Sequence, residues 1–168
     1  MPPHLPMGRQ LALALTSIYR RSVPTALYNR DILRLASEIP NLGRLDSPQA
    51  SADKRSPVCG SRVTVDVILD SHGRVAALGQ DVKACALGQA SAALMGAHAL
   101  GRTEAELAEA RDSLRAFLSG DRDDPGAWPG LALFADARPF TARHPSILLA
   151  FEAAAEAAAA AASVGARR

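Results

Sequence analysis

The pattern of apolar and polar positions divides the chain into a helical start, a strand-rich middle and a helical remainder. From Thr25 apolar residues recur at helix spacing as far as Pro40, and the Asn-Leu-Gly that follows is a typical helix end. Residues 63–69 alternate between apolar and polar, Ser71-His72-Gly73 is a typical turn, and the alternation resumes over 75–78. The pattern predicts a first helix followed by a β-hairpin.

The rest of the pattern adds one strand and several helices. Residues 80–84 predict a third strand, which would complete an antiparallel meander, whereas the polar, proline-bounded segment 47–57 predicts a loop. Helix formers over 86–99, a capping-box pattern at Thr103 and a proline at the start of the last apolar stretch predict later helices. The order indicates an α+β fold, a small three-stranded antiparallel meander packed against several helices.

The length and the net charge of the chain limit how many domains it can form and which partners it can attract. The 168 residues suit one ordinary domain, and we expect a poorly ordered extension over 1–24, a domain over 25–162 and a tail over 163–168. The net charge of +2 gives no broad field to attract nucleic acid or an anionic membrane. No apolar run approaches the roughly 18 residues of a membrane span. We therefore expect a cytoplasmic protein that binds neither nucleic acid nor membrane.

Two cysteines and a histidine fall at the ends of predicted elements. Cys59 precedes Gly60 at the start of the hairpin, where a small neighbour leaves its sulfur accessible. Cys85 lies where the third strand passes into a helix, whose N-terminus stabilises a thiolate, and His144 precedes the last helix. Such groups suit a zinc or iron–sulfur site. The alternatives are two buried, inert cysteines and a histidine that hydrogen-bonds near a helix start.

Short segments along residues 26–155 occur in the order found in one known family. They are Leu27-Tyr28, Gly43-Arg44-Leu45, Pro57-Val58-Cys59-Gly60, Cys85 with Ala90-Ser91-Ala92, Gly101-Arg102-Thr103, and Arg143-His144-Pro145-Ser146-Ile147-Leu148. In these segments the chain resembles the NifU-like N-terminal (IscU/SufU-type) iron–sulfur cluster assembly scaffolds.

The resemblance implies a carrier that is not an enzyme. Its cargo would be iron, a transient iron–sulfur cluster or zinc, bound through Cys59 and Cys85 with His144 as a further candidate ligand. The partners that the resemblance implies are a cysteine desulfurase and iron–sulfur acceptor proteins, and the oligomeric state stays open.

Two positions depart from the family's pattern of three cysteines and an aspartate. Ser61 stands where the aspartate is expected after Cys59-Gly60. The simplest alignment with the family's His-Cys-Ser segment puts Pro145 at the third cysteine, and a slip of one residue puts Ser146 there. Two hypotheses follow. The chain is either a scaffold that uses its two cysteines, helped by a ligand from a partner or second protomer, or an interaction module that no longer assembles clusters.

Overall fold

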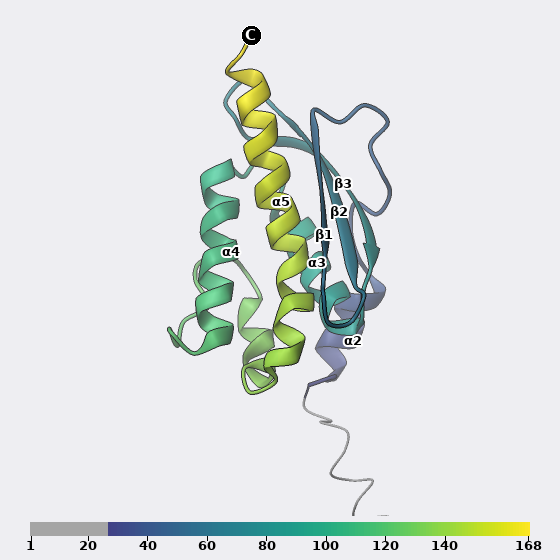
Figure 1. Ribbon diagram of the computed structural model, residues 1–168, viewed down its shortest axis with the longest axis vertical. Helices are drawn as coiled ribbons and strands as arrows, with labels where there is room; N and C mark the ends of the chain where they lie inside the picture. The colour runs from purple at the N-terminus through teal and green to yellow at the C-terminus, as the bar shows by residue number, and fades with distance from the viewer. Residues whose placement is uncertain (1–26) are drawn as a thin grey trace, which may run out of the picture.

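The computed structural model describes residues 27–168, so the predicted extension over 1–24 lies outside the described residues. The elements in chain order are α2 Arg30–Ser37, β1 Ala50–Arg55, β2 Arg62–Leu69, β3 Val75–Lys83, α3 Ala86–His98, α4 Glu104–Ser119, the short 3-10 helices η1 Leu131–Ala137 and η2 Thr141–Arg143, and α5 His144–Gly165. The expected α+β class, with a three-stranded antiparallel sheet and a helical layer beside it, is confirmed (Figure 1).

The sheet is a meander in the order β1-β2-β3. Its central pairing joins Ala52 of β1 to Val65 of β2, and Val65 to Gln80 of β3. The predicted hairpin is confirmed, but β3 is one continuous strand where two were expected. Gly79 has a packing role within it, because a Cβ there would lie 2.5 Å from the carbonyl oxygen of Gly43, whose segment crosses the outer face of the sheet.

β1 lies inside the segment that was predicted to be a loop, so that prediction was wrong. Of its six residues only Ala52 is buried, and the strand therefore lacks the apolar alternation that indicates a half-buried strand. Pairing with β2 and packing against α5 stabilise it instead. Its polar side chains suit the edge of a sheet, where they oppose pairing with other chains.

α5 is the central helix of the domain. It packs against β1, β2, α3 and α4, with α4 on the side away from the sheet (Figure 1). Small side chains allow these close contacts, and six alanines of α5 are fully buried: Ala150, Ala153, Ala154, Ala157, Ala158 and Ala161. Glu152 and Glu156 reach the surface, where they pair with Arg115 of α4 and Lys54 of β1.

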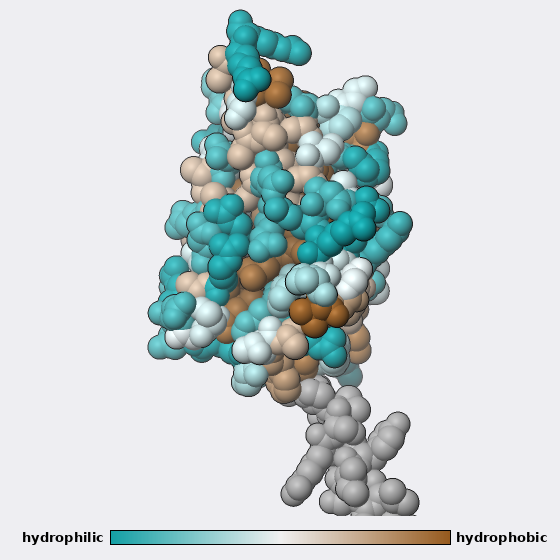
Figure 2. Space-filling model, in the orientation of Figure 1, coloured by the Kyte–Doolittle hydropathy of each residue, from teal (hydrophilic) through white to brown (hydrophobic). Residues whose placement is uncertain are grey.

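The apolar character of α5 is explained by its place in the core. Among residues 27–168, the segment Thr141–Gly165 is the one helix long and apolar enough, by length and composition, to cross a membrane. Most of it is buried inside the domain. The visible face along α4 and α5 is mainly hydrophilic, with an apolar area where the two helices meet (Figure 2).

A buried carboxylate fixes the segment that crosses the outer face of the sheet. Asp66 of β2 accepts hydrogen bonds from Nε and Nη2 of Arg44 at 2.7 and 2.8 Å, from the backbone of Leu45 at 2.9 Å and from Ser51 Oγ at 2.5 Å. Burial raises the pKa of Asp66, but these hydrogen bonds outweigh it, so the pKa is lowered and the carboxylate stays ionised.

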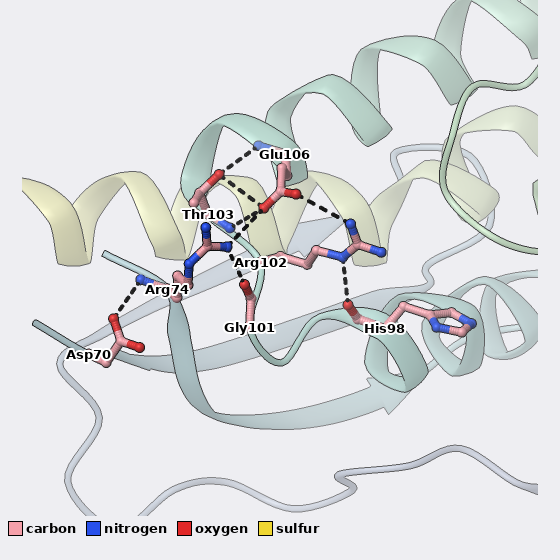
Figure 3. Close-up of polar contacts among 7 residues, drawn as sticks. All are labelled: Asp70, Arg74, His98, Gly101, Arg102, Thr103 and Glu106. Atoms are coloured by element: carbon pink, nitrogen blue, oxygen red, sulfur yellow. Dashed lines mark hydrogen bonds and ion pairs between the residues drawn. The ribbon is translucent and has the colours of Figure 1, made fainter. Parts of the chain in front are cut away.

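The β2–β3 turn is fastened to the start of α4. Arg74 donates to the carbonyl oxygen of Gly101 at 2.9 Å, and Glu106 accepts from Arg102 at 3.3 Å (Figure 3). The capping box predicted at Thr103 is confirmed, since Thr103 and Glu106 exchange hydrogen bonds between side chain and backbone. In a meander this turn and the β1–β2 turn lie at opposite ends of the sheet, so these contacts leave the Cys59 end free for other uses.

Candidate functional site

Two cysteines and two buried serines meet at the end of the domain where the β1–β2 turn lies. That turn carries Cys59 and Ser61, the β3–α3 junction carries Cys85, and the first turn of α5 carries Ser146. The start of β2 pairs with the end of β3, which places the turn and the junction side by side. Three separate segments of the chain therefore contribute to one site.

The four side chains form one continuous chain of contacts. Cys59 Sγ lies 3.0 Å from Ser61 Oγ, and Ser146 Oγ lies 3.4 Å from Ser61 Oγ and 3.2 Å from Cys85 Sγ. Both serines are buried, whereas Cys59 is exposed and Cys85 is half-buried. We call Ser61 and Ser146 the hydroxyl bridge, because they link the two thiols.

The β1–β2 turn favours the thiolate form of Cys59. Hydrogen bonds from the hydroxyls of Ser56 and Ser61 lower the pKa of Cys59 to about 7. The turn is itself closed by a 2.8 Å hydrogen bond from the backbone N of Ser56 to the carbonyl oxygen of Ser61. At neutral pH about half of Cys59 is therefore thiolate, which is the form that attacks electrophiles and binds metals.

This pKa predicts how the reactivity of Cys59 depends on pH. In Cys85→Ser, which leaves one thiol in the chain, the rate of alkylation by iodoacetamide should rise about tenfold from pH 6 to pH 8, because thiolate is lost as the pH falls through about 7. Ser61→Ala in the same background should move the midpoint upward. If the alkylation rate of Cys85→Ser, with Ser61 intact, had its pH midpoint near the ordinary thiol pKa of roughly 8.5, the prediction would be contradicted.

α5 presents Ser146 to the cysteines. Ser146 is 1% exposed and contacts both Cys85 and Ser61. Of the two residues considered for the third cysteine position, Ser146 is thus the one that contacts Cys85, and the choice between the two alignments stays a prediction. Pro145 lies in the first turn of α5, as expected, and the helix begins at His144.

Gly88 allows α5 to approach α3 closely enough for this contact. A Cβ at Gly88 would lie 2.7 Å from Ser146 Oγ and 2.7 Å from the Cβ of Ala84, closer than real contacts allow. Nearby, Ser91 of α3 donates to the carbonyl oxygen of Ile147 at 2.5 Å. The close packing of α3 and α5 thus sets the position of Ser146 beside Cys85.

We predict that Gly88→Ala destabilises the domain by about 1–3 kcal/mol, as overpacking of a core usually does. The sign of the change in the free energy of unfolding is informative, because alanine forms helices better than glycine by about 1 kcal/mol and would stabilise a helix position with free space. Urea unfolding measures the difference, with Ala97→Gly at an exposed position of α3 as the control for helix propensity. A gain in stability for Gly88→Ala would show that the two helices do not depend on the missing Cβ.

His144 is engaged by the backbone at the start of α5. Its Nε2 lies 3.0 Å from the carbonyl oxygens of both Ala137 and Arg138, so this nitrogen carries a hydrogen and donates it. In the described part of the chain no three His, Cys, Asp or Glu side chains gather as metal ligands, so His144 does not join the two cysteines in such a group. Its role as a ligand stays a prediction.

Ser56 is the member of the site that sequence reasoning missed. It accepts hydrogen bonds from the backbone N of Val58 at 3.3 Å and of Cys59 at 3.5 Å. A serine that precedes a proline in a polar segment is a typical residue for such a turn, and this signal could have identified it. The complete site thus combines two thiols with the hydroxyls of Ser56, Ser61 and Ser146.

Comparisons with known proteins identify relatives of this chain through their structures. No protein-family model and no curated protein sequence matches it. A putative iron–sulfur cluster assembly scaffold protein for the SUF system from Fervidobacterium islandicum shares its fold, with a TM-score of 0.74 and 19% identity over 81% of this chain and 99% of that one. A NifU-like protein (N-terminal) from Brucella abortus has a TM-score of 0.77 and 36% identity over 82% of this chain and 96% of that one. With this identity over nearly the whole relative, the chain belongs to the NifU-like N-terminal (IscU/SufU-type) family.

Proposed function

We propose that this protein is a scaffold or carrier in iron–sulfur cluster assembly, receiving sulfur and iron at Cys59 and Cys85. The observation that carries the proposal is the hydroxyl bridge, which links both thiols in one site at an accessible end of the domain. The similarity to a NifU-like protein supports it. The protein would hold its cargo in transit and catalyse no reaction of its own.

Cys59 is the sulfur acceptor in this proposal. Its thiolate attacks the terminal sulfur of a persulfide carried by a cysteine desulfurase, and a new sulfur–sulfur bond forms as the bond in the donor breaks. The donor cysteine leaves as a thiolate and takes up a proton, so the exchange needs no added oxidant. Ser56 and Ser61 stabilise the attacking thiolate, and the exposure of Cys59 leaves it within reach of a partner.

The candidate metal ligands of this chain also support a second function, an interaction module without cluster assembly. Iron–sulfur clusters are held by four ligands that are mainly thiolates, whereas this site offers two thiols and weakly coordinating hydroxyls. The residues of one chain therefore do not fit a complete cluster. The retention of two thiols in one site favours the scaffold.

Metal and sulfide analysis separates the two candidates. Protein purified without oxygen is assayed for iron, zinc and acid-labile sulfide before and after incubation with a cysteine desulfurase, cysteine and ferrous iron. A scaffold gains iron and sulfide together and loses the gain in Cys59→Ser. Traces of metal without sulfide, both before and after incubation, would leave the interaction module as the function.

A further inference from the structure

One chain supplies half of the thiolates that a cluster needs. Both [2Fe–2S] and [4Fe–4S] clusters take four ligands, and the chain has two cysteines. The hydroxyls of Ser61 and Ser146 are hydrogen-bonded to each other and to the thiols, and Nε2 of His144 donates to backbone carbonyls. Among residues 27–168 no third His, Cys, Asp or Glu side chain gathers with the two thiols, so the described part of one chain leaves the remaining ligands to another molecule.

Cys59 is placed where another molecule can reach it, and the half-buried Cys85 lies at the same end of the domain. Cys59 is exposed at the β1–β2 turn, next to Val58, a residue that is 64% exposed. An exposed apolar residue beside a reactive thiol is suited to a contact surface. Lys83, two residues before Cys85, and Arg143, three before Ser146, are also exposed. Their positive charges would offset the negative charge of a cluster with four thiolates.

We infer that a [2Fe–2S] cluster is held between two copies of this chain, each contributing Cys59 and Cys85. The inference rests on the proposed function. A second copy is the fitting occupant, because it presents the same pair of thiols on the same exposed end, and a two-fold axis through the cluster brings all four together in an isologous contact. The small net charge of +2 opposes such pairing only weakly.

The inference is tested on the full chain with ferric iron and inorganic sulfide, which together supply the cluster without any further oxidant, in the absence of oxygen and with all added thiols removed. Native mass spectrometry and sedimentation should find an apo monomer and a species of two chains that carries one [2Fe–2S] cluster. Loading should fall steeply on dilution, and both Cys59→Ser and Cys85→Ser should lose the paired species. A cluster on a single wild-type chain would overturn the inference.

A variant with four thiols in one chain provides the matched comparison. Ser61→Cys with Ser146→Cys replaces the hydroxyl bridge by two further thiols, so its cluster should move from the pair to the monomer. A cluster that stays between two chains of this variant would contradict the argument from ligand number. If wild type takes up neither iron nor sulfide, the proposed function fails together with the inference, whereas a cluster on the wild-type monomer removes the inference alone.

Discussion

Replacing either cysteine by serine should lower iron and sulfide uptake by more than about tenfold. Replacing a residue that only hydrogen-bonds to a metal ligand already costs roughly 10–100-fold in metal affinity. Each of the changes here removes a ligand itself, one of the two thiolates of the chain. Cys59→Ser removes a ligand and also the nucleophile that accepts sulfur. Its iron and sulfide uptake should therefore fall both with inorganic sulfide and with a desulfurase as the sulfur source. Uptake is measured as iron and acid-labile sulfide per chain after anaerobic reconstitution.

The control for these variants is a new serine at an exposed position away from the site, Ala97→Ser on α3. It should bind as much iron and sulfide as wild type, and all three variants should unfold at similar temperatures, since Cys59 is exposed and Cys85 is half-buried. Equal uptake by wild type and by both cysteine variants would show that the two thiols do not share one site.

The parts of the fold that were predictable are those with a strong local pattern. The alternation in β2 and the capping box at Thr103 are sequence-local signals, and both appear in the structure. β1 has no such signal, because Ala52 alone is buried and the strand depends on its neighbours β2 and α5. The strands predicted over 75–78 and 80–84 are one strand that continues through Gly79, where the missing side chain makes room for the close approach of Gly43.

The site was predictable in its residue types but not in its geometry. Cys59 and Cys85 follow from their positions at element ends, whereas the choice between Pro145 and Ser146 depends on how α5 is rotated against α3. That rotation is set by tertiary packing, in which Gly88 leaves room for Ser146. A short sequence motif alone does not show how two helices pack against each other.

Because the structure places Ser61 and Ser146 between the two cysteines, Ser61→Asp with Ser146→Cys should create a four-ligand site in one chain. Asp supplies an anionic oxygen and Cys a third thiolate, the ligand that clusters mainly use. Serine and cysteine differ by one atom, so the change at Ser146 should be tolerated. A buried carboxylate beside Cys59 should destabilise the apo protein, because the two negative charges repel, and bound iron should restore the stability.

The matched control is Ser61→Asp with Pro145→Cys, which adds the same two groups but puts the thiol one residue earlier on α5. Under identical anaerobic reconstitution the Ser146→Cys variant should take up several-fold more iron and sulfide than both wild type and this control, with visible charge-transfer absorption. Equal gains in the two double variants would mean that the position of the thiol on α5 does not matter, contrary to the contact between Ser146 and Cys85. If both fold as wild type does and neither gains a cluster, the surroundings of the cysteines no longer support assembly, and the interaction module becomes the better description of this protein.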